Sequence, residues 1–130
     1  SKRFYAAIGA RNEPKFTDAN AAMMILSDTI HIMLLRHDFY ATFTAKPIAD
    51  AHATSAVILC VSCESAQAVD AMVDAAASAV GKADPGPRQD MSGKMYGRSF
   101  EDPDGHIWEN VWMNMSAVPE GETVAEQPVA

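Results

Sequence analysis

The sequence is short of cysteine, of aromatic residues and of positive charge. It has 2 cysteines and 8% aromatic residues in 130, and 10 lysines and arginines against 17 acidic residues give a net charge of −7. Nucleic acids and anionic membranes both attract clustered positive charge, so neither is an expected partner. No apolar run reaches the roughly 18 residues that span a bilayer, and no signal-peptide pattern is present. These absences predict a cytoplasmic protein.

The two cysteines, Cys60 and Cys63, stand in the stretch CVSC. Such spacing occurs in redox and zinc sites, but here it lies within SAVILCVSC, whose Val, Ile and Leu content predicts a buried strand. Side chains three positions apart point to opposite faces of a strand, and a reactive first cysteine belongs at the start of a helix. We therefore expect two buried structural thiols.

The composition, 48% hydrophobic and 21% charged, is ordinary for a globular domain. Residues 1–116 are expected to form a single domain, with one half over about 1–45 and the other over about 53–116. Residues 117–130 contain Pro, Gly and Glu without an apolar period, which predicts a mobile tail.

The apolar pattern predicts a similar order of elements in both halves. The second half reads strand (56–63), helix (64–81), a loop with a short edge strand, and a hairpin (96–113). The first half reads helix, irregular strand, strand, strand, and so lacks the first strand. This order predicts an α+β fold of two βαβββ repeats, with the first strand of the first repeat missing from the chain. The expected helix stripe consists of Val69, Met72, Val73, Ala76 and Val80, with Ser65 as N-cap and Gly81 as the stop.

The stretch YGRSFEDPDGHIWENVWM, residues 96–113, places one carboxylate on an apolar strand face. Glu109 shares that face with Ile107 and Val111, and a buried carboxylate without a partner is costly. Pairing of Asp102 with His106 around the turn would put Ser99 opposite Glu109 and Gly97 opposite Val111. Small residues opposite the carboxylate leave room above it, while Phe100, Trp108 and Trp112 fall on the other face, beneath the helix. The pattern therefore predicts that Glu109 points into a cup.

The element order and the motif F-x-DPDG-x-x-x-E, here Phe100 to Glu109, resemble the vicinal oxygen chelate superfamily. This superfamily includes glyoxalase I, bleomycin-resistance proteins and extradiol dioxygenases. The resemblance implies a small-molecule ligand, a homodimer and, in the metal-dependent members, one divalent metal held by four strand positions. Glu109 stands at the last of these positions. The two others that can be read fall on Met33 and Ala56, which are poor ligands, so no cofactor is expected, although a divalent metal at Glu109 stays open.

Three readings of Glu109 remain open at this stage. In the first, a metal-free protein binds a small organic molecule, with or without turnover in which Glu109 acts as acid or base. In the second, a lyase, isomerase or dioxygenase resembling lactoylglutathione lyase uses Glu109 as a metal ligand. In the third, Glu109 is structural and satisfied by water or by Arg98. Met33 and Ala56, which are poor ligands at two of the family's metal positions, favour the first reading, in which the expected substrate-binding residues are His31, Met33, Gly97 and Ser99.

Overall fold

The computed structural model describes residues 1–117, which form two halves joined by a long connection. The predicted tail therefore lies almost wholly outside the described residues. No helix in the described part is long and apolar enough to cross a membrane. The first half contains α1 (Lys2–Ala7), β1 (Arg11–Glu13), η1 (Pro14–Phe16), β2 (Ala21–Ile25) and β3 (His31–Leu35), and the connection contains α2 (His37–Tyr40). The second half contains β4 (Ile58–Ser62), α3 (Ala66–Ser78), β5 (Lys82–Ala83), β6 (Gln89–Asp90), β7 (Met95–Glu101), β8 (Ile107–Met113) and η2 (Met115–Ala117).

Each half has its own sheet, which confirms the predicted α+β class. The first sheet has the order β1-β2-β3 and is antiparallel. The second has the order β4-β8-β7-β5, with β6 also paired to β7, and β4 runs parallel to β8. The strand that precedes α3 thus lies beside the last strand of its half. In the first half the equivalent edge of β3 has no neighbouring strand among residues 1–117.

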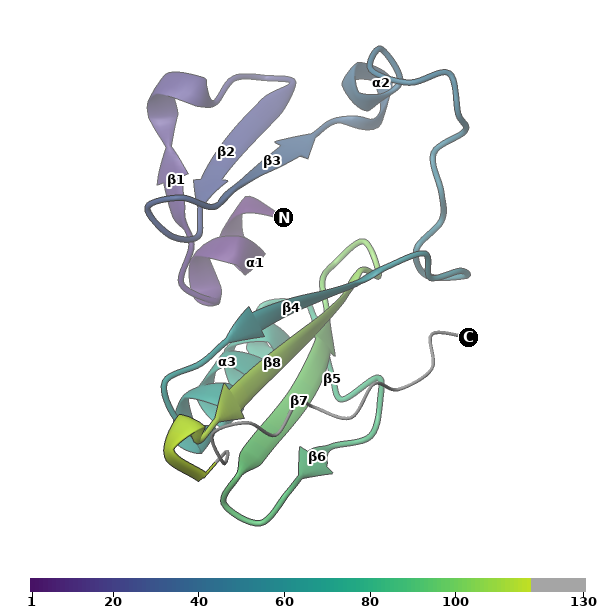
Figure 1. The fold of residues 1–130 in the computed structure, drawn as a ribbon. Coiled ribbons are helices and arrows are strands. Elements are labelled where there is room, and N and C mark those ends of the chain that lie inside the picture. The colour runs from purple at the N-terminus through teal and green to yellow at the C-terminus, as the bar shows by residue number, and fades with distance from the viewer. Residues whose placement is uncertain (118–130) are drawn as a thin grey trace.

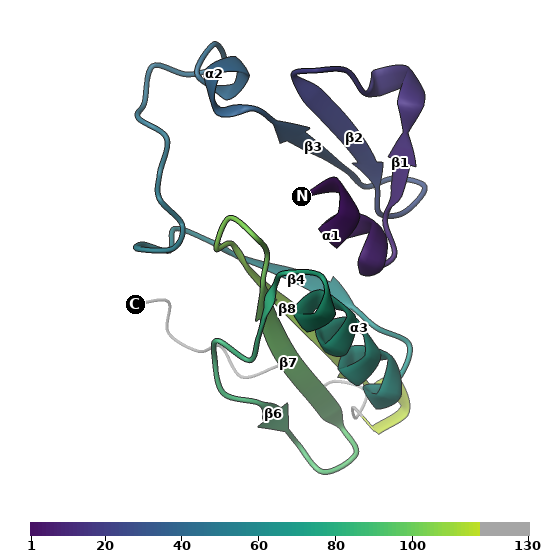
Figure 2. The same cartoon turned by 180° about the vertical axis from the view of Figure 1, so that it is seen from behind.

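Helix α1 lies between the first sheet and the second half, and α3 covers one face of the second sheet, as Figures 1 and 2 show from opposite sides. The ring of Phe4 on α1 lies 5.7 Å from that of Phe100 on β7, and Tyr5 lies 6.0 Å from Trp108 on β8. Met24 of β2 joins the same core from the first sheet. Both sheets therefore turn their apolar face inward, and their free faces point away from each other.

A buried hydrogen bond also ties the first half to the second. The Tyr5 hydroxyl donates to Asp102 Oδ2 at 2.5 Å. Burial, and then this carboxylate acceptor, raise the pKa of Tyr5 well above its usual range. The phenol therefore stays protonated and keeps its role as donor at any physiological pH.

Helix α3 begins as predicted but ends earlier. The Ser65 side chain accepts a hydrogen bond from the backbone N–H of Ala68 at 3.0 Å and caps the helix. Val69, Val73 and Ala76 are buried. Val80 is 84% exposed and has a φ of 71°, so its prediction as part of the stripe was wrong. The helix stops at Ser78 and the chain turns through a left-handed residue at Val80, which swings that side chain into solvent.

Strand β4 is more exposed than its apolar sequence predicted. Ile58 and Leu59 are 55% and 40% exposed, and Cys60 is exposed as well. The expectation of two buried thiols was therefore wrong for Cys60, while Cys63 is half-buried. The physical reason is that β4 pairs only with β8 among the described residues, so it forms an edge of its sheet. A continuous apolar run indicates a buried strand only when both of its sides are covered.

The connection between the halves touches the β7–β8 turn at Gly105. That glycine has a φ of +92°, and a Cβ atom there would lie 2.7 Å from the backbone nitrogen of His52 and 2.8 Å from the carbonyl carbon of Ala51. The glycine is therefore required twice, for the turn and for the close approach of the connection.

Candidate functional site

The β7–β8 hairpin has the predicted register. The Asp102 N–H donates to the carbonyl of His106 at 2.9 Å, and Asp102 Oδ1 accepts from the N–H groups of Asp104 and His106, both at 2.9 Å. Ser99 consequently lies opposite Glu109. The aspartate that opens the DPDG motif thus fixes which side chains share a face with the carboxylate.

A shallow hollow lies beside Glu109 on the free face of the second sheet, with about 10 Å³ of space that a water-sized molecule can enter. Three of the predicted site residues, Gly97, Ser99 and Glu109, come together in it. The remaining lining residues are Pro87, Gln89, Arg98 and Val111. We refer to this hollow as the Glu109 pocket.

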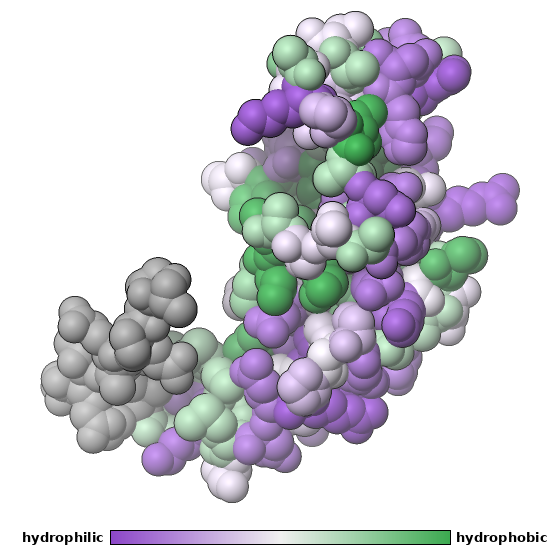
Figure 3. Space-filling model, turned by 90° about the vertical axis from the view of Figure 1, so that its right-hand side faces the viewer, coloured by the Kyte–Doolittle hydropathy of each residue, from purple (hydrophilic) through white to green (hydrophobic). Residues whose placement is uncertain are grey.

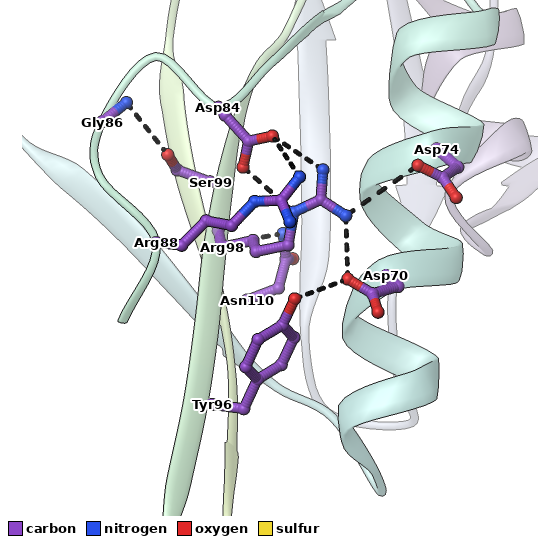
Figure 4. A network of polar contacts seen from close by, with 9 residues as sticks. All are labelled: Asp70, Asp74, Asp84, Gly86, Arg88, Tyr96, Arg98, Ser99 and Asn110. Carbon is purple, nitrogen blue, oxygen red and sulfur yellow. Dashed lines mark hydrogen bonds and ion pairs between the residues drawn. The ribbon is translucent and has the colours of Figure 1, made fainter. Parts of the chain in front are cut away.

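Arg98 does not neutralise Glu109, although it borders the Glu109 pocket. Its side chain leaves β7 on the helix side, where it donates to Asp84 and Asp70 (Figure 4). No hydrogen bond or ion pair to the Glu109 carboxylate occurs among residues 1–117. Arg98 is therefore not the partner of a structural Glu109. The half-buried Glu109 side chain faces solvent and the pocket.

Cys60 is a neighbour of Glu109 that sequence reasoning missed. The two residues are Cα partners in the parallel pairing of β4 with β8, so their side chains share the free face. Partial loss of solvent around the thiol, and then the negative charge of Glu109, raise the pKa of Cys60. Cys60 is thus a neighbour of Glu109 on the sheet, although it does not line the Glu109 pocket. Ala56, which the resemblance placed at this ligand position, precedes β4.

His31 and Met33 lie on the free face of the other sheet. Both are exposed on β3, on the side opposite Ile32, which packs against the core. Neither residue lines the Glu109 pocket, and β3 and β8 belong to separate sheets (Figure 1). The sequence could not reveal this, since it does not say whether the helices of the two halves lie outside a common cup or inside a common core.

The described residues offer no ready-made metal centre. Among residues 1–117, no group of three or more His, Cys, Asp or Glu side chains is arranged to hold a metal ion. Around Glu109 the donor set is one carboxylate, one thiol and the hydroxyl of Ser99, and the pairings of β8 bring no imidazole beside it. This set does not fit the carboxylate and imidazole ligands that catalytic iron, nickel or zinc use.

Comparisons with known proteins agree with this fold. The model of the Glyoxalase/Bleomycin resistance protein/Dioxygenase superfamily matches residues 4–110. A hypothetical protein from S. aureus has a TM-score of 0.71 at 18% identity, covering 86% of this chain and 82% of its own. A family enzyme from Burkholderia phytofirmans PsJN has a TM-score of 0.68 at 15% identity and covers 87% of each chain.

A third structure, a glyoxalase-related enzyme from Fulvimarina pelagi, has a TM-score of 0.71 at 17% identity and covers 86% of this chain and 77% of its own. No curated protein matches the chain. At these identities the solved structures support the fold alone, whereas the family model spans most of the sequence. The chain belongs to the Glyoxalase/Bleomycin resistance protein/Dioxygenase superfamily.

Proposed function

We propose that this protein binds a small organic molecule against Glu109, without a metal, and that a second copy of the chain completes the site. The observation that carries the proposal is the half-buried carboxylate of Glu109, which lies in a hollow beside Ser99 and Gly97 and has no protein partner among residues 1–117. A carboxylate in this position accepts hydrogen bonds from a ligand that carries N–H or O–H groups. It can also take a proton from a carbon next to a carbonyl, as a lone acid or base.

The size of the Glu109 pocket supports completion by a second chain. The space in it that a water-sized molecule can enter is about 10 Å³, which is enough for roughly one water molecule and far below the range of about 300–1,000 Å³ that is usual for small-molecule sites. We expect the missing wall to come from the free face of β3 in the second chain, which carries His31 and Met33. The free faces of both sheets carry exposed apolar side chains: Met33 of the first sheet is 46% exposed and Ile58 of the second is 55% exposed. Figure 3 shows hydrophobic side chains, in green, gathered around a hollow in the upper part of one side of the molecule.

The protein is therefore expected to be a homodimer with two equivalent sites, each built from the second half of one chain and the first half of the other. Analytical ultracentrifugation at micromolar concentration should give twice the mass of one chain. Met33→Lys should shift that mass to the monomer, because it places a charge in the proposed interface. Val80→Asn, at a residue 84% exposed and left-handed, is the matched control and should leave the dimer intact. A wild-type monomer at this concentration would rule the shared site out.

Glu109→Gln tests the ligand site itself. Native mass spectrometry of the purified protein should show a small organic molecule that the variant loses, because Gln keeps the shape of Glu but not its charge. Glu101→Gln is the control, since Glu101 lies on the neighbouring strand β7, on the same face of the sheet but outside the Glu109 pocket. Melting temperatures of both variants should stay within about 2 °C of the wild type, as for most surface changes. Retention of the molecule by Glu109→Gln would contradict the proposal.

Elemental analysis of the same sample distinguishes the proposed metal-free function from the alternative, a metal-dependent enzyme. A lyase, isomerase or dioxygenase that uses Glu109 as a ligand would contain stoichiometric iron, nickel or zinc, and Glu109→Gln would release it. We favour the metal-free function because Cys60, Ser99 and the apolar residues around Glu109 supply no second carboxylate or imidazole.

A further inference from the structure

The Glu109 pocket has one wall that is not part of a long strand. Pro87 and Gln89, which line it, belong to the segment between β5 and β7. This segment, residues 84–90, leaves the sheet edge after Ala83 and returns to β7 as the short edge strand β6, in which Gln89 pairs with Gly97. We call it the wall loop. Besides the pairing of β6 with β7, two consecutive residues of β7 hold it, one from each face of the strand.

Ser99 holds the wall loop on the free face. Its hydroxyl accepts a hydrogen bond from the N–H of Gly86 at 3.3 Å, and its carbonyl accepts one from the N–H of Asp84 at 2.9 Å. The first contact is visible on the left of Figure 4. The hydroxyl opposite Glu109 is thus engaged with the loop that forms the wall of the pocket.

Arg98 holds the wall loop on the helix face through charge. Its Nε and Nη2 donate to the two carboxylate oxygens of Asp84 at 3.0 and 2.7 Å, the forked geometry that makes arginine–carboxylate pairs strong. Its Nη1 donates to Asp70 of α3 at 2.8 Å. The Arg98 side chain is only 7% exposed, whereas Asp70 is 48% exposed and Asp84 is 26% exposed. The guanidinium therefore depends on both carboxylates, and Asp84 is the more enclosed of the two.

The backbone of Asp84 indicates that the pairing with Arg98 determines the path of the wall loop. Asp84 has a φ of 50°, in the left-handed region that non-glycine residues rarely occupy. Such a conformation persists when surrounding contacts impose it. Here the contacts are the forked bonds from Arg98, a longer bond from Arg88 at 3.4 Å and the backbone bond to Ser99. Hydrogen bonding from Arg98, helped by its positive charge, also lowers the pKa of Asp84.

We propose that Arg98 and Asp84 are positioning residues for the Glu109 pocket, which hold the wall loop against Ser99 so that Pro87 and Gln89 close one side. Neither side chain has to touch a ligand for this role. The proposal rests on the proposed function only for the use of the pocket, because the position of the loop is a property of the ligand-free protein.

Two single substitutions separate positioning of the loop from general stabilisation. Asp84→Asn and Asp70→Asn each remove one carboxylate from Arg98, but only Asp84 lies in the wall loop. Hydrogen exchange measured by NMR reports the two effects separately. The Gly86 amide reports on the loop, and the amide of Val73, which is fully buried on α3, reports on the helix and core. The relevant quantity is the ratio of the Gly86 exchange rate to the Val73 exchange rate.

Asp84→Asn should raise this ratio by about tenfold or more, because the loop loses a charge-assisted fork. Asp70→Asn should leave the ratio unchanged even if both rates rise. Asp74→Asn is the control, since Asp74 is 76% exposed and lies 3.9 Å from Arg98, and it should change neither rate. Arg98→Lys keeps the charge but loses the fork, so it should raise the ratio as well if Asp84→Asn does not fold.

If the exchange ratio changes equally in the Asp84 and Asp70 variants, Arg98 only stabilises the fold. If the ratio changes in neither the Asp84 variant nor the Arg98 variant, the position of the wall loop does not depend on the Arg98–Asp84 pair. Both results would overturn the proposal. Because no ligand is involved, either result is distinct from a failure of the ligand experiment on Glu109.

Acid should open the wall loop in the wild type. Hydrogen bonds from Arg98 lower the pKa of Asp84 and Asp70, with help from the Tyr96 hydroxyl at Asp70 and from the nearby charge of Arg88. The contribution of the pairs is therefore fully present above the usual carboxylate pKa of about 4. It is lost as the pH falls through the lowered values of the folded protein. The exchange ratio, corrected for the intrinsic pH dependence of exchange, should therefore rise only below about pH 4 in the wild type. In Asp84→Asn the ratio should already be raised at neutral pH and should change little with acid.

Discussion

Replacing Gly81 by alanine is expected to destabilise the fold severely, by about 3 kcal/mol or more of the free energy of unfolding. A Cβ atom at this position would lie 2.6 Å from Cε2 of Phe4 and 2.7 Å from the carbonyl oxygens of Ala76 and Glu101. Two of these three atoms belong to the backbone, at the end of α3 and at the end of β7. They cannot move aside without breaking the helix end or the strand pairing.

The Gly81 N–H also donates to that same Ala76 carbonyl at 2.9 Å, so the collision falls on a bond that ends the helix. Denaturant unfolding of Gly81→Ala should show a midpoint far below that of the wild type, or no cooperative transition. Gly86→Ala provides the comparison, because its Cβ would meet only the Ser99 hydroxyl at an ordinary 3.6 Å. Similar unfolding midpoints for the two variants would show that the backbone around Gly81 can yield.

The second large effect is expected from Phe100→Ala, which should cost about 3–5 kcal/mol, the usual range for a buried phenylalanine. Phe100 is 0% exposed, and its ring lies 5.7 Å from that of Phe4 and 6.3 Å from that of Trp108, with which it stacks. The substitution would leave a cavity at the point where both halves meet.

Phe43→Ala is the matched control for this loss. Phe43 is 67% exposed in the connection and contacts the ring of Phe39 at 5.2 Å, so its removal should change the free energy of unfolding by less than about 1 kcal/mol. Thermal melts followed by near-ultraviolet and far-ultraviolet circular dichroism should coincide for the wild type, because α1 shares the core of the second half. A Phe100→Ala protein as stable as the Phe43→Ala protein would mean that the core lies elsewhere.

Local patterns in the sequence predicted the local parts of the fold. The DPDG turn carries its own geometry, so Asp102, Gly105 and the pairing of Ser99 with Glu109 followed from the residues alone. The start of α3 followed in the same way from the capping serine, Ser65. The end of the helix did not, because Val80 and Gly81 are adjacent and either could supply the turn. In the structure Val80 adopts the left-handed conformation, and Gly81 instead occupies the tight space beside Phe4 of the other half, where no side chain fits.

Relations between distant segments could not be predicted in this way. The neighbour of Glu109 on β4 depends on a parallel register that no turn fixes, since β4 and β8 are separated by a helix and three strands. Reasoning from the resemblance reached Ala56, whereas the pairing brings Cys60 to the carboxylate. The separation of His31 and Met33 from Glu109 depends on how two apolar sheet faces meet around α1 and α3, and several arrangements would bury those faces equally well.

The contact of the connection with Gly105 has a consequence for how two chains can associate. The connection between β3 and β4 is long enough for the two halves to be exchanged between copies by domain swapping. Near its C-terminal end, however, Ala51 and His52 pack closely against Gly105 of the second half. This contact shortens the free part of the connection and so raises the effective concentration of one half around the other within the same chain. Exchange of halves would have to release it first, so a dimer assembled from folded chains should form by docking of free faces rather than by swapping.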